Sequence, residues 1–248
     1  GEAELVEEED PCALPKACKN EVEIEGIREA HKRDGAAVCE FLAWLEKEFL
    51  SGNVTEIDAQ NYLDWCRQQR ALWKDQSFPT ISAVGQNGAI VHYRATKQSN
   101  RLISPNCLYL VDSGGQYLDG TTDITRTIAI GDPTTEQRDC YTRVLKGHIA
   151  VFTTNLNRIN TGKDIDKRAR FFLKKVNLDY SHGTGHGVGH FLNVHEGPQA
   201  ISKYNNVKIL PGMILSNEPG YYEKKKFGIR IENLIYVEKN KKKKFLKI

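Results

Sequence analysis

Apolar side chains recur at helical spacing in four stretches of the chain. Asn20 with Glu23 resembles a capping box before the first stretch, and Thr55 with Asp58 begins the second. The third stretch follows Thr134 or Thr135, and Ser51-Gly52-Asn53 separates the first stretch from the second. This pattern predicts helices over residues 20–50, 55–72, 134–156 and 164–176.

Shorter apolar runs, bounded by turn residues, predict strands. The turn signal Gln86-Asn87-Gly88 joins the first two runs, and Asp119-Gly120 separates the next two. The predicted strands cover residues 80–84, 89–93, 108–111, 124–130, 213–217 and 228–237. Helix pairs and strand groups therefore alternate, which indicates an α+β fold of two related units around one antiparallel sheet.

No linker composition interrupts residues 20–238, so we expect one domain there. Residues 1–19 are acidic and contain two prolines, and we expect an irregular arm left from a preceding domain or linker. Residues 239–248 carry much of the excess positive charge of a chain whose net charge is +3. We expect them to form a solvated basic tail that is cut short.

Composition excludes several classes of function. Outside the tail the sequence has no basic cluster interleaved with aromatic residues, so we expect no nucleic-acid partner. It has no apolar run long enough to span a membrane and no visible signal peptide, so we expect a cytoplasmic protein without a membrane partner. The cysteines form no C-x-x-C pair, which indicates reduced thiols rather than a zinc ribbon or a disulfide framework.

Two aspartates stand at the ends of strand-like runs, where an unpaired carboxylate is costly. Asp112 ends the run Leu108–Val111, and Asp123 precedes the run Ile124–Ile130. A two-residue turn at Asp119-Gly120 would place Asp112 opposite Thr127 rather than opposite Asp123. We therefore expect a longer connection, or a bulge at Gly114-Gly115, between the two strands.

Two glutamates have the same unusual placement. Glu218 follows the apolar run Met213–Leu215, and Glu232 lies within the run Ile229–Ile235. Their spacing suits adjacent antiparallel strands whose turn is Lys224-Lys225-Lys226. Four carboxylates on one sheet face would repel one another, and some would be protonated unless cations lay between them. Two divalent ions balance the four charges, and oxygen-rich ligands suit Mn²⁺, with Co²⁺ or Zn²⁺ as alternatives.

A glycine-rich segment adds histidines to these acids. The segment SHGTGHGVGHFLNVHEGP, residues 181–198, indicates a loop whose backbone closely approaches another group. It lacks the Lys-Ser/Thr pair of a phosphate-binding loop, so nucleotide binding is not expected. Its histidines are candidates for metal binding or proton transfer; they are His182, His186, His190 and His195.

Several motifs together carry a family resemblance. The segments DGTTDITRT, HGTGHGVGHFLNVHEGP, SNEPGYYE and FGIRIEN follow in this order and resemble the catalytic domain of the aminopeptidase P family. These Xaa-Pro aminopeptidases belong to the pita-bread metallopeptidases, and the resemblance runs from about Leu14 to Val237. It implies a pita-bread fold, in which two pseudo-symmetric halves form a curved antiparallel sheet flanked by helices.

The resemblance also implies a dinuclear site, usually with manganese, in which Asp123 and Glu232 bridge the ions. The implied ligands are Asp112, Asp123, His186, Glu218 and Glu232. His92 and His195 become substrate and transition-state contacts, and His182 a part of the pocket for proline. Tyr222 and Arg230 would hold ligand carboxylates in place, whereas His190 has no implied role and is expected at the surface.

The implied activity is removal of the first residue from peptides with proline in the second position. The attacking group would be a hydroxide that bridges the two ions, with Glu218 as the acceptor of its proton. The expected partner is a peptide with an Xaa-Pro N-terminus, and a homodimer is a further expectation. The alternatives are a methionine aminopeptidase, a prolidase-like enzyme, or a non-catalytic pita-bread module that binds peptides. The filled ligand positions favour an enzyme.

Overall fold

The computed structural model describes residues 3, 5–8, 10–238 and 244–248. Two helices precede strands in each half of the chain, which confirms the predicted alternation of helix pairs and strand groups. The first half contains α2 (Glu21–Glu48), α3 (Glu56–Gln68), β1 (Trp73–Val84), β2 (Cys107–Tyr117), β3 (Gly120–Thr121) and β4 (Ile124–Ile130). The second half contains α4 (Thr135–Phe152), α5 (Gly162–Lys174), β5 (Gly185–Gly187), β6 (Glu196–Ile201), β7 (Ile214–Asn217), β8 (Gly220–Glu223), β9 (Phe227–Arg230) and β10 (Asn233–Val237).

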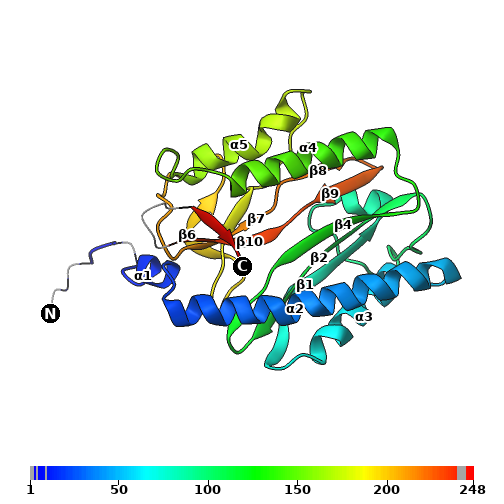
Figure 1. The fold of residues 1–248 in the computed structure, drawn as a ribbon, viewed down its shortest axis with the longest axis horizontal. Coiled ribbons are helices and arrows are strands. Elements are labelled where there is room, and N and C mark those ends of the chain that lie inside the picture. Colours follow the sequence, from blue (N-terminus) through cyan, green and yellow to red (C-terminus); the bar gives the residue numbers. More distant parts are fainter. Residues whose placement is uncertain (1–2, 4, 9, 239–243) are drawn as a thin grey trace.

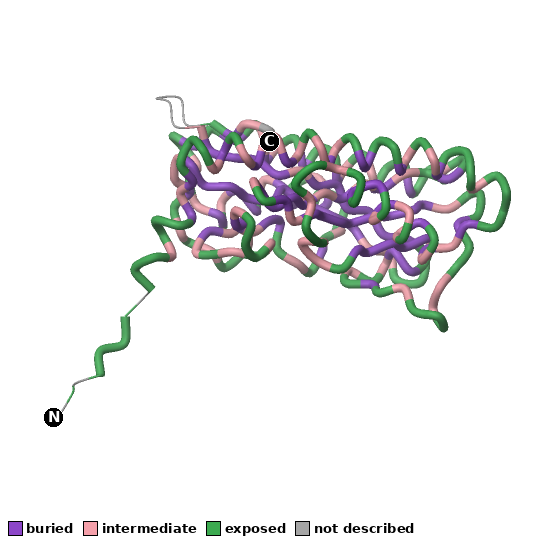
Figure 2. The backbone as a smooth tube through the Cα atoms, turned by 90° about the horizontal axis from the view of Figure 1, so that it is seen from below, coloured by how far each residue is buried: buried purple, intermediate pink, exposed green. Residues whose placement is uncertain are grey.

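The strands lie between the two helix pairs. Figure 1 shows α2 and α3 along one long side of the strands, and α4 and α5 along the opposite side. Strands β1 to β4 form one antiparallel sheet, and β8 and β9 form a hairpin. A second sheet has the order β11-β10-β7-β5-β6, in which β11 spans Phe245–Lys247. Buried backbone runs through the middle of the molecule, with exposed residues around it (Figure 2).

Capping residues and an apolar stripe explain why the first helices form where they do. Asn20 with Glu23 and Thr55 with Asp58 form complete capping boxes, as the sequence predicted. On α2, Phe41 and Leu45 are fully buried and pack in a core that includes strand residues of β2. Burying one such side chain stabilises the fold by roughly 1.5–3 kcal/mol.

The hairpin that carries the aspartates differs from its predicted register. Strand β2 pairs with β3 and β4 in one continuous register in which Tyr117 faces Gly120 and Asp112 faces Thr125. The turn is therefore Leu118-Asp119, one residue earlier than predicted, and this pairing needs no bulge at Gly114-Gly115. Asp123 stands two residues before Thr125, on the same face of the strand.

The hairpin that carries the glutamates agrees with its prediction. Strand β8 pairs with β9 around Lys224-Lys225-Lys226, with Glu223 opposite Phe227. Strand β7 pairs with β10 in the same register, with Asn217 opposite Asn233. Glu218 lies between β7 and β8, and Glu232 lies between β9 and β10. Both acids therefore stand where the strand pairing is interrupted.

The first sheet and its following loop depart from the sequence pattern in two ways. Strand β1 begins at Trp73 rather than at residue 80, and bulges let it follow β2 past Pro79. Residues 89–93 are not a strand. Instead Asn87 and Tyr93 direct their side chains to the carboxylate of Glu56, which is fully buried. These side-chain bonds replace the ladder bonds that a strand would need.

Both ends of the chain contribute more structure than the sequence predicted. Within the expected irregular arm, α1 (Ala13–Ala17) forms a short helix, and Cys18 bridges to Met213. Within the expected solvated tail, β11 (Phe245–Lys247) pairs with β10, and Phe245 is buried. The tail prediction is therefore wrong for residues 245–247, because apolar Phe245 packs in the second core. Residues 239–243 lie outside the described residues.

Candidate functional site

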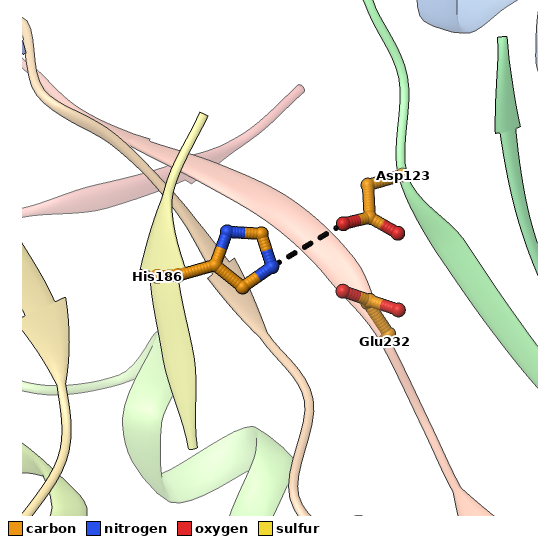
Figure 3. Close-up of side chains that lie close together, drawn as sticks. All are labelled: Asp123, His186 and Glu232. Atoms are coloured by element: carbon orange, nitrogen blue, oxygen red, sulfur yellow. Dashed lines mark ion pairs between the residues drawn. The ribbon is translucent and has the colours of Figure 1, made fainter. Parts of the chain in front are cut away.

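The ends of several strands bring the four acids and one histidine to a single place. Asp112 lies within β2, Asp123 precedes β4, Glu218 follows β7, and Glu232 lies between β9 and β10. His186 lies in the middle of β5. All of them line one cavity of about 300 Å³. Figure 3 shows the side chains of Asp123, His186 and Glu232 pointing toward one another.

Short distances join these side chains. Nε2 of His186 lies 3.4 Å from Oδ2 of Asp123 and 3.3 Å from Oε1 of Glu218. One donor atom each of Asp123, His186 and Glu232 fall within 4.8 Å of one another. A single cation at their centre could contact all three donors.

Burial and the repulsion of neighbouring carboxylates make Asp123 and Glu232 resist ionisation. Burial raises the pKa of Asp123 to about 7, and the negative charge of Asp112 adds to this increase, while a hydrogen bond with His186 opposes it. Burial, followed by the charges of Asp123 and Glu218, raises the pKa of Glu232 well above its ordinary value. Both carboxyl groups would ionise more readily with a cation beside them.

In Glu218 and His186, by contrast, the charged form is favoured. Burial alone would raise the pKa of Glu218, but the hydrogen bond and the charge of His186 outweigh it and lower this pKa to about 2. Burial opposes protonation of His186, yet hydrogen bonds to Asp123 and Glu218 raise its pKa well above its ordinary value. A positive charge on His186 is therefore stabilised by the two carboxylates beside it.

A buried arginine holds Asp112. Nη2 of Arg230 donates to Oδ2 of Asp112 at 2.7 Å, and Nη1 donates to the hydroxyl of Tyr222 at 2.6 Å. Tyr222 contacts Nε2 of His182 at 2.8 Å rather than a ligand carboxylate. We expected Arg230 and Tyr222 each to hold a carboxylate of the implied ligand set. Arg230 does contact such a carboxylate, that of Asp112.

Of the other histidines that the sequence singled out, three line the cavity and one does not. His92, His182 and His195 line the cavity. The ring of His195 lies 4.2 Å from the ring of His186, centroid to centroid, and burial lowers its pKa, as does the charge of His186. Burial also lowers the pKa of His182. His190 is half-buried beside Gly26 of α2, away from these side chains.

Two hydroxyl groups near the acids were missed by the sequence reasoning. Thr125 donates from Oγ1 to Oε2 of Glu232 at 2.6 Å. Ser216 donates to Oε1 of Glu218 at 2.9 Å and accepts a bond from the backbone N–H of His186 at 3.0 Å. Each lies two residues from an acid along the chain, so strand periodicity was the available signal.

The glycine-rich segment approaches neighbouring strands closely. A Cβ atom on Gly185 would lie 2.0 Å from the carbonyl oxygen of Ser216, and one on Gly187 would lie 2.3 Å from that of Glu196. The predicted close approach is therefore made to β7 and β6, and residues 185–187 are a strand rather than a loop.

The donor set fits divalent cations. The site offers four carboxylates and one imidazole, a combination that suits hard or borderline metals. Oδ1 of Asp112 is buried and has no hydrogen-bond partner among the described residues, which is costly unless a ligand contacts it. Asp123 and Glu232 also carry raised pKa values that a cation would relieve.

Residues 25–239 match the model of metallopeptidase family M24. The chain belongs to metallopeptidase family M24. The expected pita-bread fold of this family is confirmed by solved structures that superimpose closely on the chain. Among the described residues no helix is long and apolar enough to cross a membrane.

Several members of family M24 are close relatives. A probable Xaa-Pro aminopeptidase P from Aspergillus niger is 49% identical over 240 residues, which cover 95% of this chain and 39% of that protein. Xaa-Pro aminopeptidase 1 from Dictyostelium discoideum is 50% identical over 241 residues, which cover 94% and 38%. The chain thus spans less than half the length of these relatives.

Solved structures of family M24 agree with this result. An X-prolyl aminopeptidase from Caenorhabditis elegans, described as a cytosolic enzyme with a di-nuclear active site, has a TM-score of 0.88 and 42% identity, over 96% of this chain and 40% of that one. A prolidase from Thermococcus sibiricus has a TM-score of 0.83 and 28% identity, over 95% and 60%.

Proposed function

We propose that this chain is the catalytic domain of a metal-dependent Xaa-Pro aminopeptidase, which removes the first residue from peptides with proline in the second position. The observation that carries the proposal is the convergence of four carboxylates and His186 on one cavity. Curated relatives named Xaa-Pro aminopeptidase, at about 49% identity, support the substrate class.

In this proposal Asp112, Asp123, His186, Glu218 and Glu232 would hold two divalent cations. We propose Mn²⁺, with Co²⁺ or Zn²⁺ as alternatives, because a ligand set of oxygens with one imidazole suits these ions. When bound, such ions lower the pKa of water and polarise a carbonyl group. The di-nuclear site described for the Caenorhabditis elegans enzyme supports two ions rather than one.

The side chains of this chain then divide the remaining tasks. Glu218 accepts the proton of the attacking water, since it lies beside His186 at the centre of the site. His195, kept neutral by its lowered pKa, donates a hydrogen bond to the carbonyl oxygen as negative charge develops there. One such donor is worth roughly 3 kcal/mol in the transition state. His92 is a second contact for the substrate.

We propose that three apolar side chains of the cavity, Phe78, Ile81 and Val91, form the wall against which a proline ring packs. His182 also lines the cavity. An Xaa-Pro bond is a tertiary amide without an N–H group, so a wall without an acceptor for that proton tolerates it. Xaa-Pro peptides are therefore the substrates that we propose.

Hydrolysis of matched peptides by the purified chain with Mn²⁺ tests this proposal. Release of the first residue from Xaa-Pro-Xaa tripeptides, with little cleavage of Xaa-Pro dipeptides or Met-Ala peptides, is the expected result. Faster cleavage of Xaa-Pro dipeptides would favour a prolidase, an alternative supported by the match to the Thermococcus sibiricus structure. Absence of bound metal and of hydrolysis would favour a peptide-binding module.

Two further expectations stay proposals. We propose a cytoplasmic location, supported by the description of the Caenorhabditis elegans enzyme as cytosolic. A homodimer remains a prediction, which analytical ultracentrifugation of the purified chain would test.

A further inference from the structure

A buried ion pair ties the start of the chain to the histidine segment. Nζ of Lys19 lies 2.6 Å from Oε1 of Glu196, and the two side chains are 1% and 4% exposed. The Lys19 ammonium also donates to the carbonyl oxygen of Lys16 at 2.9 Å, and the Lys19 backbone N–H donates to that of Gly212 at 2.9 Å. A backbone carbonyl oxygen therefore holds the ammonium group in addition to the carboxylate of Glu196.

Stability alone is a poor explanation for this pair. Removing two charges from water costs several kcal/mol per ion, and apolar residues of similar size are often as stabilising as a buried ion pair. Neither Lys19 nor Glu196 lines the cavity of the functional site. The role of the ion pair therefore depends on which part of the chain it holds in place.

Glu196 stands directly after His195 and begins β6. It pairs with Gly187, which stands directly after His186. The rings of His186 and His195 contact each other edge to face, with centroids 4.2 Å apart and an interplanar angle of 72°. Among the described residues no hydrogen bond holds the His195 ring, so its position depends on the backbone that Glu196 anchors.

We infer that Lys19 is a positioning residue that places the His195 ring beside His186 in the cavity by holding the side chain of Glu196. This inference rests on the proposed function, in which His195 contacts the scissile carbonyl group. A displacement of about 1 Å at such a contact can lower turnover by about 100-fold.

Replacing both residues of the ion pair by apolar ones separates its positioning role from its effect on the stability of the fold. In the double variant Lys19→Met/Glu196→Leu no buried charge is left unpaired, so the fold is retained, but the tether is lost. We expect kcat for an Xaa-Pro tripeptide to fall about 10- to 100-fold, with KM, metal content and the melting temperature little changed. Lys19→Arg keeps the ion pair and should recover most of kcat.

Lys16 supplies the matched control. Its Nζ lies 3.6 Å from Oε2 of the same Glu196, but its side chain is 49% exposed. Because exposed ion pairs contribute little, Lys16→Met should leave kcat within about twofold of the parent. An equal loss of kcat in Lys16→Met and in the double variant would overturn the inference.

A double-mutant cycle with His195→Ala tests whether the ion pair affects kcat through His195. If Lys19 acts through His195, adding the double variant to His195→Ala causes no further loss of kcat. Full additivity of the two losses would show that the ion pair acts elsewhere, and would overturn the inference.

Histidine ring resonances give a readout that does not depend on activity. In ¹H–¹⁵N spectra of the zinc-loaded chain, the double variant should shift the ring signals of His195 and leave those of His190 in place. Unshifted His195 signals would overturn the inference even if the chain is an active peptidase. Shifted signals in a chain without peptidase activity would support the positioning and contradict only the proposed function.

Discussion

Thr125 donates a hydrogen bond of 2.6 Å to Oε2 of Glu232, across 107 residues of sequence. The backbone N–H of Glu232 in turn donates to the carbonyl oxygen of Thr125 at 3.2 Å. Two contacts in opposite directions therefore fix an acid of the second half against a strand of the first. The orientation of Glu232 therefore depends on Thr125, which does not itself line the cavity.

Thr125→Val should weaken metal binding without unfolding the chain. The hydroxyl orients a proposed ligand, and loss of such a partner typically lowers metal affinity 10- to 100-fold. Titration of Mn²⁺ into the metal-free variant measures the change. Thr127→Val is the matched control, because Thr127 lies on the same face of β4 but donates to the backbone oxygen of Arg230. An unchanged affinity in Thr125→Val would contradict the prediction.

Asp123→Asn should remove both metal and peptidase activity. The substitution deletes one charge from a site that needs negative ligands, while it relieves repulsion in the metal-free protein, where the pKa of Asp123 is raised to about 7. We therefore expect Mn²⁺ to raise the melting temperature of the parent but not of the variant. Asp119→Asn, at the tip of the same hairpin, should behave as the parent, and a variant of Asp123 that retains its metal would refute the scheme.

His195→Ala should leave metal content intact and lower kcat about 100-fold, the effect of losing one donor to a developing oxyanion. Elemental analysis and steady-state kinetics measure the two quantities separately. His190→Ala is the control from the same segment, and it should change neither quantity. If His195→Ala turned over substrate at the parent rate, His195 would have no part in the reaction.

Acid should destabilise the chain through Asp34. Burial alone would raise the pKa of this carboxyl group, but Arg67, at 2.7 Å, outweighs it and holds the pKa below 3.8. A lowered pKa means that this contribution to stability is present above pH 3.8 and is lost as the pH falls further. Asp34→Asn should therefore cost about 3–5 kcal/mol at pH 7, because it leaves Arg67 buried and unpaired.

Urea unfolding at several pH values checks this prediction. The difference in unfolding free energy between the parent and Asp34→Asn should shrink as the pH falls below 3.8. Glu40→Gln removes the partly exposed partner of Arg70 and should cost no more than about 1 kcal/mol. A difference for Asp34→Asn that stays constant with pH would show that its carboxylate does not titrate with folding.

Local chemistry explains the parts of the fold that the sequence predicted. The capping boxes at Asn20 and Thr55 and the turn at Lys224-Lys225-Lys226 are short-range signals, and each was found where it was expected. The acids could be singled out because a carboxylate beside a buried strand needs a partner. Their roles as ligands stay a proposal.

Long-range contacts explain the parts that were missed. No sequence signal near residues 89–93 predicts that the Tyr93 hydroxyl will donate to the carboxylate of Glu56, and this hydrogen bond prevents the expected strand. Gly185 and Gly187 suggested a loop, but their missing side chains make room for adjacent strands. The ion pair of Lys19 with Glu196 joins residues 177 positions apart, and neither residue is unusual in its own surroundings.

The division of the four acids between the two halves of the chain has a consequence for how the site can arise. Asp112 and Asp123 come from one half of the chain, and Glu218 and Glu232 from the other. A cut in the connection between Ile130 and Thr135 would give each fragment one pair of acids. Separate fragments should then be inert, and the proposed peptidase activity should return only after they reassociate. That activity would therefore report docking between the two parts.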